Sequence, residues 1–204
     1  MIIDTYRTLK APSEGIYKEK GSKFLAFAFP VETEEGIKQK LDEVRKKYYD
    51  ARHHCYAWFL GADKSRFRAN DDGEPSNSAG KPILGKLQSH DLSQVLIVVV
   101  RYFGGIKLGV GGLINAYRSA ADDAILNGTI VQRKMKTFFE IQFSYEAMND
   151  VMTFIKSKRI EQVSHQFELD CKIKLAIPQS EFEMVKKGLL KIDGVDVITS
   201  QQPS

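Results

Sequence analysis

The sequence predicts an α+β protein built from two domains, and three observations lead to that prediction. Apolar runs of strand length, such as VLIVVV at 95–100, alternate with segments whose apolar residues recur every three or four positions, which is the period of an amphipathic helix. The order of these segments changes near Gly128, after which they follow a β-α-β-β-α-β order. We therefore expect one domain at residues 1–130 and a second at residues 131–204, with a short basic connection inside 128–136.

The first strands and the first helix follow from local patterns. Residues 15–31 (GIYKEKGSKFLAFAFPV) predict two strands around a turn at 21–22. Residues 32–50 predict a helix, because apolar side chains at positions 37, 41, 44 and 48 share one face, while the first turn is acidic and the last turn is basic. The next strand is expected at 54–60 (HCYAWFL).

A long polar segment, GADKSRFRANDDGEPSNSAGKP at 61–82, interrupts this pattern. It is longer than an ordinary connection, and loops of such length are usually functional or disordered. We expect Ser78 to cap a short helix that runs to about Gln88. The unbroken apolar run at 95–103 (VLIVVVRYF) predicts a strand that is covered on both faces. A glycine-rich turn and an amphipathic helix follow it.

The second domain is predicted from six segments. Strands are expected at 138–145, 160–166, 168–177 and 195–200, and helices at 147–158 and 180–190. A β-α-β-β-α-β order is the split βαβ, or ferredoxin-like, pattern. The second domain is therefore predicted to be ferredoxin-like.

Composition and charge indicate which partners and which cellular location to expect for this protein. The net charge of +4 and the pI near 8.9 predict weak attraction to anionic partners. No apolar run is long enough to span a membrane, and residues 1–10 lack the features of a signal peptide. Cys55 and Cys171 are far apart in the sequence, so no disulfide framework is implied. We expect a cytoplasmic protein that does not associate with membranes.

The segment GGIKLGVGG at 104–112 is the strongest functional signal. It lacks the Gly-Lys-Ser/Thr end of a nucleotide-binding P-loop, and Ile114 stands where the third glycine of the dinucleotide fingerprint would fall. Glycines still allow a backbone to approach an anion closely, and the N–H groups at a helix start point toward such an anion. The alternative is a tight strand-to-helix connection without a ligand. The candidate phosphate- or nucleic-acid-binding residues are Arg52, His53, His54, Lys81, Arg101, Gly104, Gly105, Lys107, Gly109, Gly111 and Gly112.

Two adjacent histidines and an acidic loop precede this turn. On a strand, His53 and His54 point to opposite faces, so they do not readily share a metal ion. Asp71, Asp72 and Glu74 offer oxygens to a hard cation, and equally to Arg66 and Arg68 or to the start of the next helix. We favour a structural or partner-recognition role for this interaction loop, and we expect no metal ion and no cofactor.

Signals for nucleophilic catalysis are weak. The sequence contains no Gly-x-Ser-x-Gly elbow. Cys55 and Cys171 lie in expected strands, where a thiol most often packs as a small apolar group. We therefore assign no catalytic residue and favour a non-enzymatic role, while an enzymatic one stays open.

Four motifs occur together and in a recognisable order: KGSKFLAF, ARHHCYAW, DDGEPSNSAGKP and VVVRYFGGIKLGVGGL. In this combination the sequence resembles the IMPACT family, and specifically its bacterial, YigZ-like two-domain members. The resemblance implies an N-terminal domain like the second domain of ribosomal protein S-five and a C-terminal domain like the last domain of elongation factor G. Eukaryotic relatives regulate translation initiation, although they use an additional domain for this.

The residues and the resemblance together predict an RNA- or ribosome-binding protein that modulates translation. Its partners would be RNA or ribosomal particles, or a translation-related protein. Two alternatives stay open. One is a magnesium-dependent, nucleotide-binding enzyme that uses the same glycine turn. The other is a protein-interaction module that acts through the Asp71–Pro82 loop.

Overall fold

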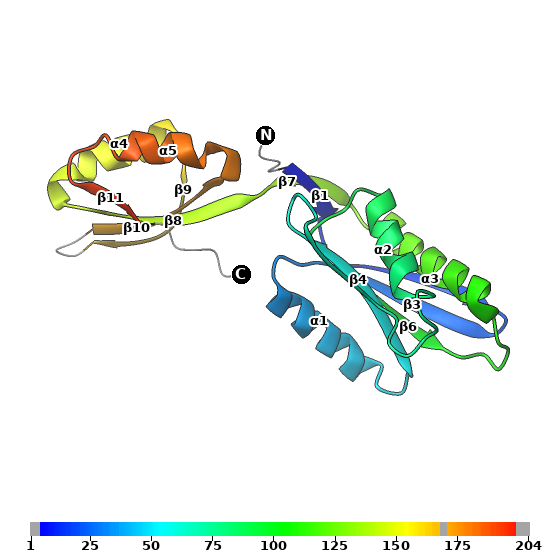
Figure 1. Cartoon of the computed structure of the whole chain (residues 1–204). Helices are drawn as coiled ribbons and strands as arrows, with labels where there is room; N and C mark the ends of the chain where they lie inside the picture. Colours follow the sequence, from blue (N-terminus) through cyan, green and yellow to red (C-terminus); the bar gives the residue numbers. More distant parts are fainter. Residues whose placement is uncertain (1–4, 168–170, 199–204) are drawn as a thin grey trace. The chain divides into compact units, whose positions relative to one another are not determined.

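The computed structural model describes residues 5–167 and 171–198 (Figure 1). These residues form two compact units, Thr5–Arg133 and residues 134–198, and each is described by itself. The mixture of helices and β-sheets confirms the predicted α+β class. In the described part of the chain, no helix combines the length and the apolar character that crossing a membrane requires.

A five-stranded antiparallel sheet forms the centre of the N-terminal unit. Its strand order is β2-β3-β6-β4-β5. The strands are β2 (Ser13–Glu19), β3 (Ser22–Pro30), β4 (His53–Leu60), β5 (Arg66–Asn70) and β6 (Val95–Tyr102). β6 lies in the middle, and its residues 95–101 are all buried, as its unbroken apolar run predicts.

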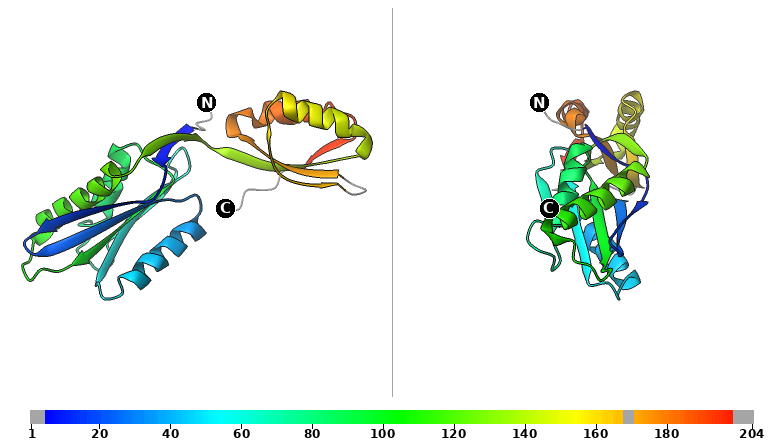
Figure 2. Two further views of the ribbon diagram at one scale, coloured as in Figure 1. Left: turned by 180° about the vertical axis from the view of Figure 1, so that it is seen from behind. Right: turned by 90° about the vertical axis from the view of Figure 1, so that its right-hand side faces the viewer.

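Helices cover both faces of this sheet (Figure 2). α1 (Glu34–Lys47) lies on one face, and α2 (Gly80–Ser89) and α3 (Gly109–Leu126) lie on the other. Neighbouring residues of β6 therefore enter two different cores. Val98 belongs to the core under α1, and Val99 belongs to the core under α2 and α3.

Sequence patterns miss three strands in this unit. β1 (Thr5–Leu9) and β7 (Ile130–Lys134) form a separate two-stranded sheet, so the predicted connection at 128–136 is in part a strand. β5 lies inside the segment that the sequence predicts to be a loop, and four of its five residues are exposed. β1 and β7 are short and pair with each other across more than a hundred residues, whereas β5 pairs with the neighbouring β4 but has exposed, charged side chains. None of the three therefore shows a clear local apolar period.

The C-terminal unit has the predicted β-α-β-β-α-β order. Its elements are β8 (Lys136–Phe143), α4 (Met148–Ser157), β9 (Glu161–Phe167), β10 (Cys171–Pro178), α5 (Phe182–Leu189) and β11 (Val195–Ile198). The strands form one antiparallel sheet in the order β11-β8-β10-β9, and the core lies between the sheet and the two helices. Parts of two predicted strands, at 168–170 and 199–200, lie outside the described residues.

Candidate anion-binding site

A groove with a volume of about 680 Å³ opens in the N-terminal unit where β6 ends and α3 begins. Its walls come from residues 50–53, 74–75, 101–103 and 107–110, together with Leu113. The antiparallel pairing of β4 with β6 places His53 opposite Arg101 at this groove. Segments that are far apart in the sequence therefore meet in one concave surface, which is the usual form of a binding site.

The glycine-rich turn carries the chain from β6 to α3. Gly104 lies against the β2–β3 turn: a Cβ atom there would stand 1.9 Å from the carbonyl carbon of Gly21. The N–H of Gly104 donates to Ser22 Oγ at 3.1 Å, so this glycine joins two turns rather than facing the groove. Gly109 has a φ of +71°, which favours glycine, and it lines the groove. The other glycines predicted to bind phosphate, namely Gly105, Gly111 and Gly112, do not line it.

The start of α3 contributes Gly109 and Val110 to the groove. Its N-cap residue, Leu108, makes no capping hydrogen bond through its side chain, and the first turn contains no acidic residue. An α-helix leaves its first four N–H groups without partners inside the helix, and its dipole places a partial positive charge there. The groove therefore favours a negatively charged group at this end.

Two exposed cations, Arg52 and Lys107, line the groove. Neither of them forms an ion pair with another residue that the structure describes. Asp50 is an acidic residue on the same rim, and it accepts a hydrogen bond from the Tyr102 hydroxyl at 2.7 Å. This hydrogen bond raises the pKa of Tyr102 to about 12. Because neither Arg52 nor Lys107 has an acidic partner among the described residues, both are available to an external anion.

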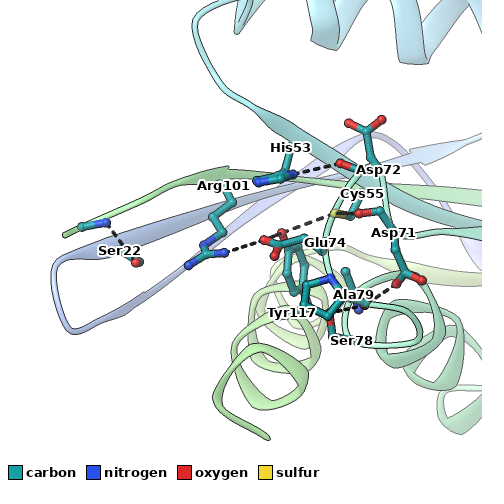
Figure 3. A network of polar contacts seen from close by, with 12 residues as sticks. Ser22, His53, Cys55, Asp71, Asp72, Glu74, Ser78, Ala79, Arg101 and Tyr117 are labelled. Atoms are coloured by element: carbon teal, nitrogen blue, oxygen red, sulfur yellow. Dashed lines mark hydrogen bonds and ion pairs between the residues drawn. The ribbon is translucent and has the colours of Figure 1, made fainter. Parts of the chain in front are cut away.

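His53 is oriented by the acidic loop. Its Nδ1 atom lies 2.9 Å from the carbonyl oxygen of Asp72 (Figure 3). Because a carbonyl oxygen only accepts, Nδ1 carries the proton of the neutral ring. Nε2 then accepts a hydrogen bond, or donates one when the ring is protonated. His53 can therefore contact a phosphate or a hydroxyl group in the groove.

Arg101 and Glu74 form a buried ion pair at the base of the groove. Arg101 Nη1 lies 2.6 Å from Glu74 Oε1, and the two side chains are only 9% and 4% exposed. The Arg101 guanidinium also lies over the ring of Phe24, at 5.5 Å from the ring centroid. Its Nε atom is buried and has no hydrogen-bond partner. The sequence predicts Arg101 as a phosphate ligand, and the structure holds it as a fixed cation, paired with Glu74, whose buried Nε atom has no partner.

Two further side chains extend this pair into the core (Figure 3). The Tyr117 hydroxyl donates to Glu74 Oε1 at 2.8 Å. The Cys55 thiol lies 3.3 Å from the Tyr117 oxygen and 3.0 Å from the carbonyl oxygen of Asp71. Burial raises the pKa of both Cys55 and Tyr117. The thiol therefore stays protonated, which agrees with its predicted role as a packing residue rather than a nucleophile.

The carboxylates of the acidic loop bind the chain's own donors. Asp71 Oδ1 accepts from the N–H groups of Ala79 and Gly80 at 2.9 and 2.8 Å, so Asp71 caps α2. The predicted cap was Ser78, and this prediction is wrong, because its hydroxyl donates to the carbonyl oxygen of Pro75 at 2.6 Å. Asp72 Oδ2 accepts from the N–H of His54 at 2.7 Å. The exposed residues of the predicted interaction loop are Gly73, residues 75–77 and Lys81.

His54 and Lys81 lie away from the groove, in contrast to the prediction that they line it. His54 is buried, and its Nε2 atom lies 3.0 Å from the carbonyl oxygen of Tyr48 at the end of α1. Successive residues of a strand point to opposite faces, which separates His54 from His53. Lys81 is exposed on α2 and does not line the groove. The structure thus brings Arg52, His53, Arg101, Lys107 and Gly109 together and leaves these two out.

One feature of the candidate site that the sequence did not predict is the buried polar group beneath the groove, which includes Tyr117 and Glu74. Tyr117 is fully buried on the apolar face of α3, beside Ala116 and Ala120. A buried tyrosine hydroxyl normally needs a hydrogen-bond partner, so a tyrosine on the apolar face of a predicted helix could have indicated a buried polar contact.

Among the described residues, no group of three or more His, Cys, Asp or Glu side chains is arranged to hold a metal ion.

Comparison with known proteins gives a consistent result. The Impact N-terminal domain family matches residues 20–125, the region that contains the groove. The chain is 31% identical to the IMPACT family member YigZ of Escherichia coli, over 84% of this chain and 85% of the relative. It is 35% identical to the IMPACT family member YvyE of Bacillus subtilis, over 71% of this chain and 66% of the relative.

A solved structure is similar over the whole chain. It is a crystal structure of a protein described as hypothetical, with a TM-score of 0.76 and 26% identity. The match covers 99% of this chain and 100% of the other. Both structural units therefore have counterparts in that protein.

Proposed function

This chain belongs to the IMPACT family, and on that premise we propose that it is an RNA-binding protein that acts on translation through ribosomal particles or their RNA. The groove of the N-terminal unit would hold the RNA phosphates. Lys107, Arg52 and the first turn of α3 would bind them, and His53 Nε2 would accept a hydrogen bond from a ribose 2′-hydroxyl. Arg101, whose charge is balanced by Glu74, would form the base of the groove.

The observation that carries this proposal is the convergence of unpaired positive groups on one groove. Arg52 and Lys107 form no ion pair among the described residues, and the start of α3 has neither a side-chain cap nor an acidic residue. The charge of Glu74 is balanced by Arg101 at 2.6 Å. The N–H groups at the start of α3 need hydrogen-bond partners, and an anion held between Arg52 and Lys107 would supply them.

The same geometry disfavours the magnesium-dependent enzyme. Asp71 gives one oxygen to Ala79 and Gly80 and the other to Asn77. Glu74 Oε1 already accepts from Arg101 and Tyr117. These carboxylates would have to break internal hydrogen bonds before they could hold a cation.

The fold relationships implied by the motifs belong to this proposal as well. The N-terminal unit would resemble the second domain of ribosomal protein S-five, and the C-terminal unit the last domain of elongation factor G. Both are domains of translation proteins that contact RNA, which supports RNA over other polyanions. A shared fold does not imply a shared function, so the groove remains the main support. A cytoplasmic location follows from the same proposal.

Sedimentation with bacterial ribosomal particles through a sucrose gradient tests the proposal. The native protein should travel with the particles at low salt and leave them as salt rises, because counterions return to the phosphates. The double variant Arg52→Ala/Lys107→Ala should stay at the top of the gradient. Its control is Lys38→Ala/Lys46→Ala, which removes the same charge from exposed positions on α1. The proposal fails if the native protein does not sediment with particles, or if both variants lose binding equally.

A further inference from the structure

Exposed apolar side chains border the groove at the glycine-rich turn. Phe103, Ile106 and Val110 are 58%, 56% and 52% exposed, and Phe103 and Val110 line the groove itself. A turn that bound only phosphates would have no use for three exposed apolar side chains. Clusters of exposed apolar residues usually mark a contact surface. The ligand of this groove therefore needs an apolar part beside its charged part.

Phe103 is held in place rather than loose. The Arg101 guanidinium lies 5.6 Å from the centroid of the Phe103 ring, and Arg101 is itself fixed by Glu74 at 2.6 Å. A cation over an aromatic face is attracted by the ring electrons. The ring thus has a fixed cation beside it while more than half of its side chain stays open to solvent. Such a ring is a prepared surface for a second planar group.

The charged and apolar parts of the groove are close in the chain. Lys107 and the start of α3 follow Phe103 by only a few residues, and all of them border the same groove. A nucleotide joins a phosphate and a planar base through one sugar. We propose that the groove binds single-stranded RNA, with one unpaired base stacked on Phe103 and the neighbouring phosphate bound by Lys107 and the first turn of α3. This inference rests on the proposed function and defines its ligand more closely.

Double-stranded RNA does not meet these requirements. In an A-form duplex the bases are stacked on one another, and proteins reach mainly phosphates and 2′-hydroxyl groups. A duplex at this groove would cover Phe103, Ile106 and Val110 with charged backbone, which gives these side chains no apolar partner. Extruding a base from a duplex costs a few kcal/mol. We therefore expect single strands to bind more tightly than duplexes.

Fluorescence anisotropy with three labelled probes tests this inference on the full-length protein. The probes are a short RNA single strand, a duplex of the same length, and an abasic strand that carries the same phosphates without bases. Phe103→Ala should weaken binding of the RNA single strand by about 5- to 140-fold, the loss expected for one stacked base. The variant should bind the abasic strand as the native protein does, because no phosphate contact is lost.

Two further variants separate stacking from general effects. Phe103→Leu keeps an apolar side chain but removes the aromatic face, so it should also bind the single strand more weakly. Phe67→Ala removes a phenylalanine that is 59% exposed on β5 and does not line the groove, so it should bind like the native protein. Thermal unfolding of each variant shows that the fold is kept.

The outcomes distinguish this inference from the proposed function. If the duplex and the abasic strand bind as tightly as the RNA single strand, and the Phe103 variants bind normally, the groove contacts phosphates alone and the stacking inference is overturned. If Phe103→Leu matches the native protein while Phe103→Ala does not, apolar contact replaces stacking and the inference is again overturned. If no probe binds at low salt, the inference is overturned, and the sedimentation experiment decides separately whether the proposed function fails.

Discussion

Replacing Glu74 with alanine should destabilise the N-terminal unit by about 3–5 kcal/mol, the usual cost of breaking a buried ion pair. Its Oε1 atom lies 2.6 Å from Arg101 Nη1, and the two side chains are 4% and 9% exposed. The substitution leaves a buried guanidinium without a counter-charge, and the Nε atom of Arg101 already lacks a partner. It also removes the acceptor of the Tyr117 hydroxyl, which donates at 2.8 Å. The charge and the lost hydrogen bond act in the same direction.

Urea unfolding followed by tryptophan fluorescence measures this loss. The chain has a single tryptophan, Trp58, which is buried in the core under α1, so its signal reports the N-terminal unit. With an m-value of about 1–3 kcal/mol/M, a loss of 3 kcal/mol lowers the urea midpoint by about 1 M or more. Glu32→Gln, at an exposed position, is the matched control and should change stability by less than about 0.5 kcal/mol.

A double variant separates the missing partner from the missing pair. Glu74→Leu/Arg101→Met replaces both charges with apolar side chains of similar size, and such replacements are often neutral. It should therefore be more stable than Glu74→Ala. Two results would refute the reasoning: a loss below about 1 kcal/mol for Glu74→Ala, or a double variant that is no more stable than the single one.

Three further predictions follow from the same unit. Gly104→Ala should lower the thermal unfolding midpoint, because its Cβ would stand 1.9 Å from the backbone of Gly21; an unchanged midpoint would contradict the close approach. Asp71→Ala should cost about 1–2 kcal/mol in urea unfolding, because it removes the cap of α2, and Asp71→Asn should recover part of it. Asp50→Asn should move the ionisation of Tyr102 down from about 12 toward 10 in an ultraviolet titration, because Asp50 raises this pKa. The stability contributed by that hydrogen bond is fully present below about pH 10 and is lost as the pH rises through about 12, so a titration that Asp50→Asn leaves unchanged would speak against the bond.

Most long elements could be predicted because their apolar period is local. α1 and the strand pair β2–β3 follow from residues within a few positions of one another, and β6 follows from an unbroken apolar run. β5 could not be predicted, since Arg66 and Arg68 give it the polarity of a loop. β1 and β7 were missed for a related reason: each is short, and its partner lies more than a hundred residues away in the chain.

The sequence indicates which residue types the candidate site contains, but not which individual residues lie at it. The glycine turn, Arg52, His53 and Lys107 are residue types suited to binding phosphates, and the structure gathers them at one groove. Nothing local indicates that Arg101 is paired with Glu74, because that contact depends on how a loop folds against a strand. The same limit explains why the sequence names Ser78 as the cap of α2 and leaves the acidic loop as an alternative, although Asp71 of that loop caps the helix.

By itself the sequence determined the α+β class, the order of elements in the C-terminal unit and the residue types of a candidate anion-binding turn, because periodicity and backbone freedom are properties of neighbouring residues. Only the tertiary structure decided which side chains are available to a ligand. Arg101, His54 and Asp71 form an ion pair or hydrogen bonds with other residues of the unit, whereas Arg52 and Lys107 line the groove without an ion pair among the described residues. A buried polar group must find a partner when water is excluded, and strand pairing and packing determine which partner is within reach.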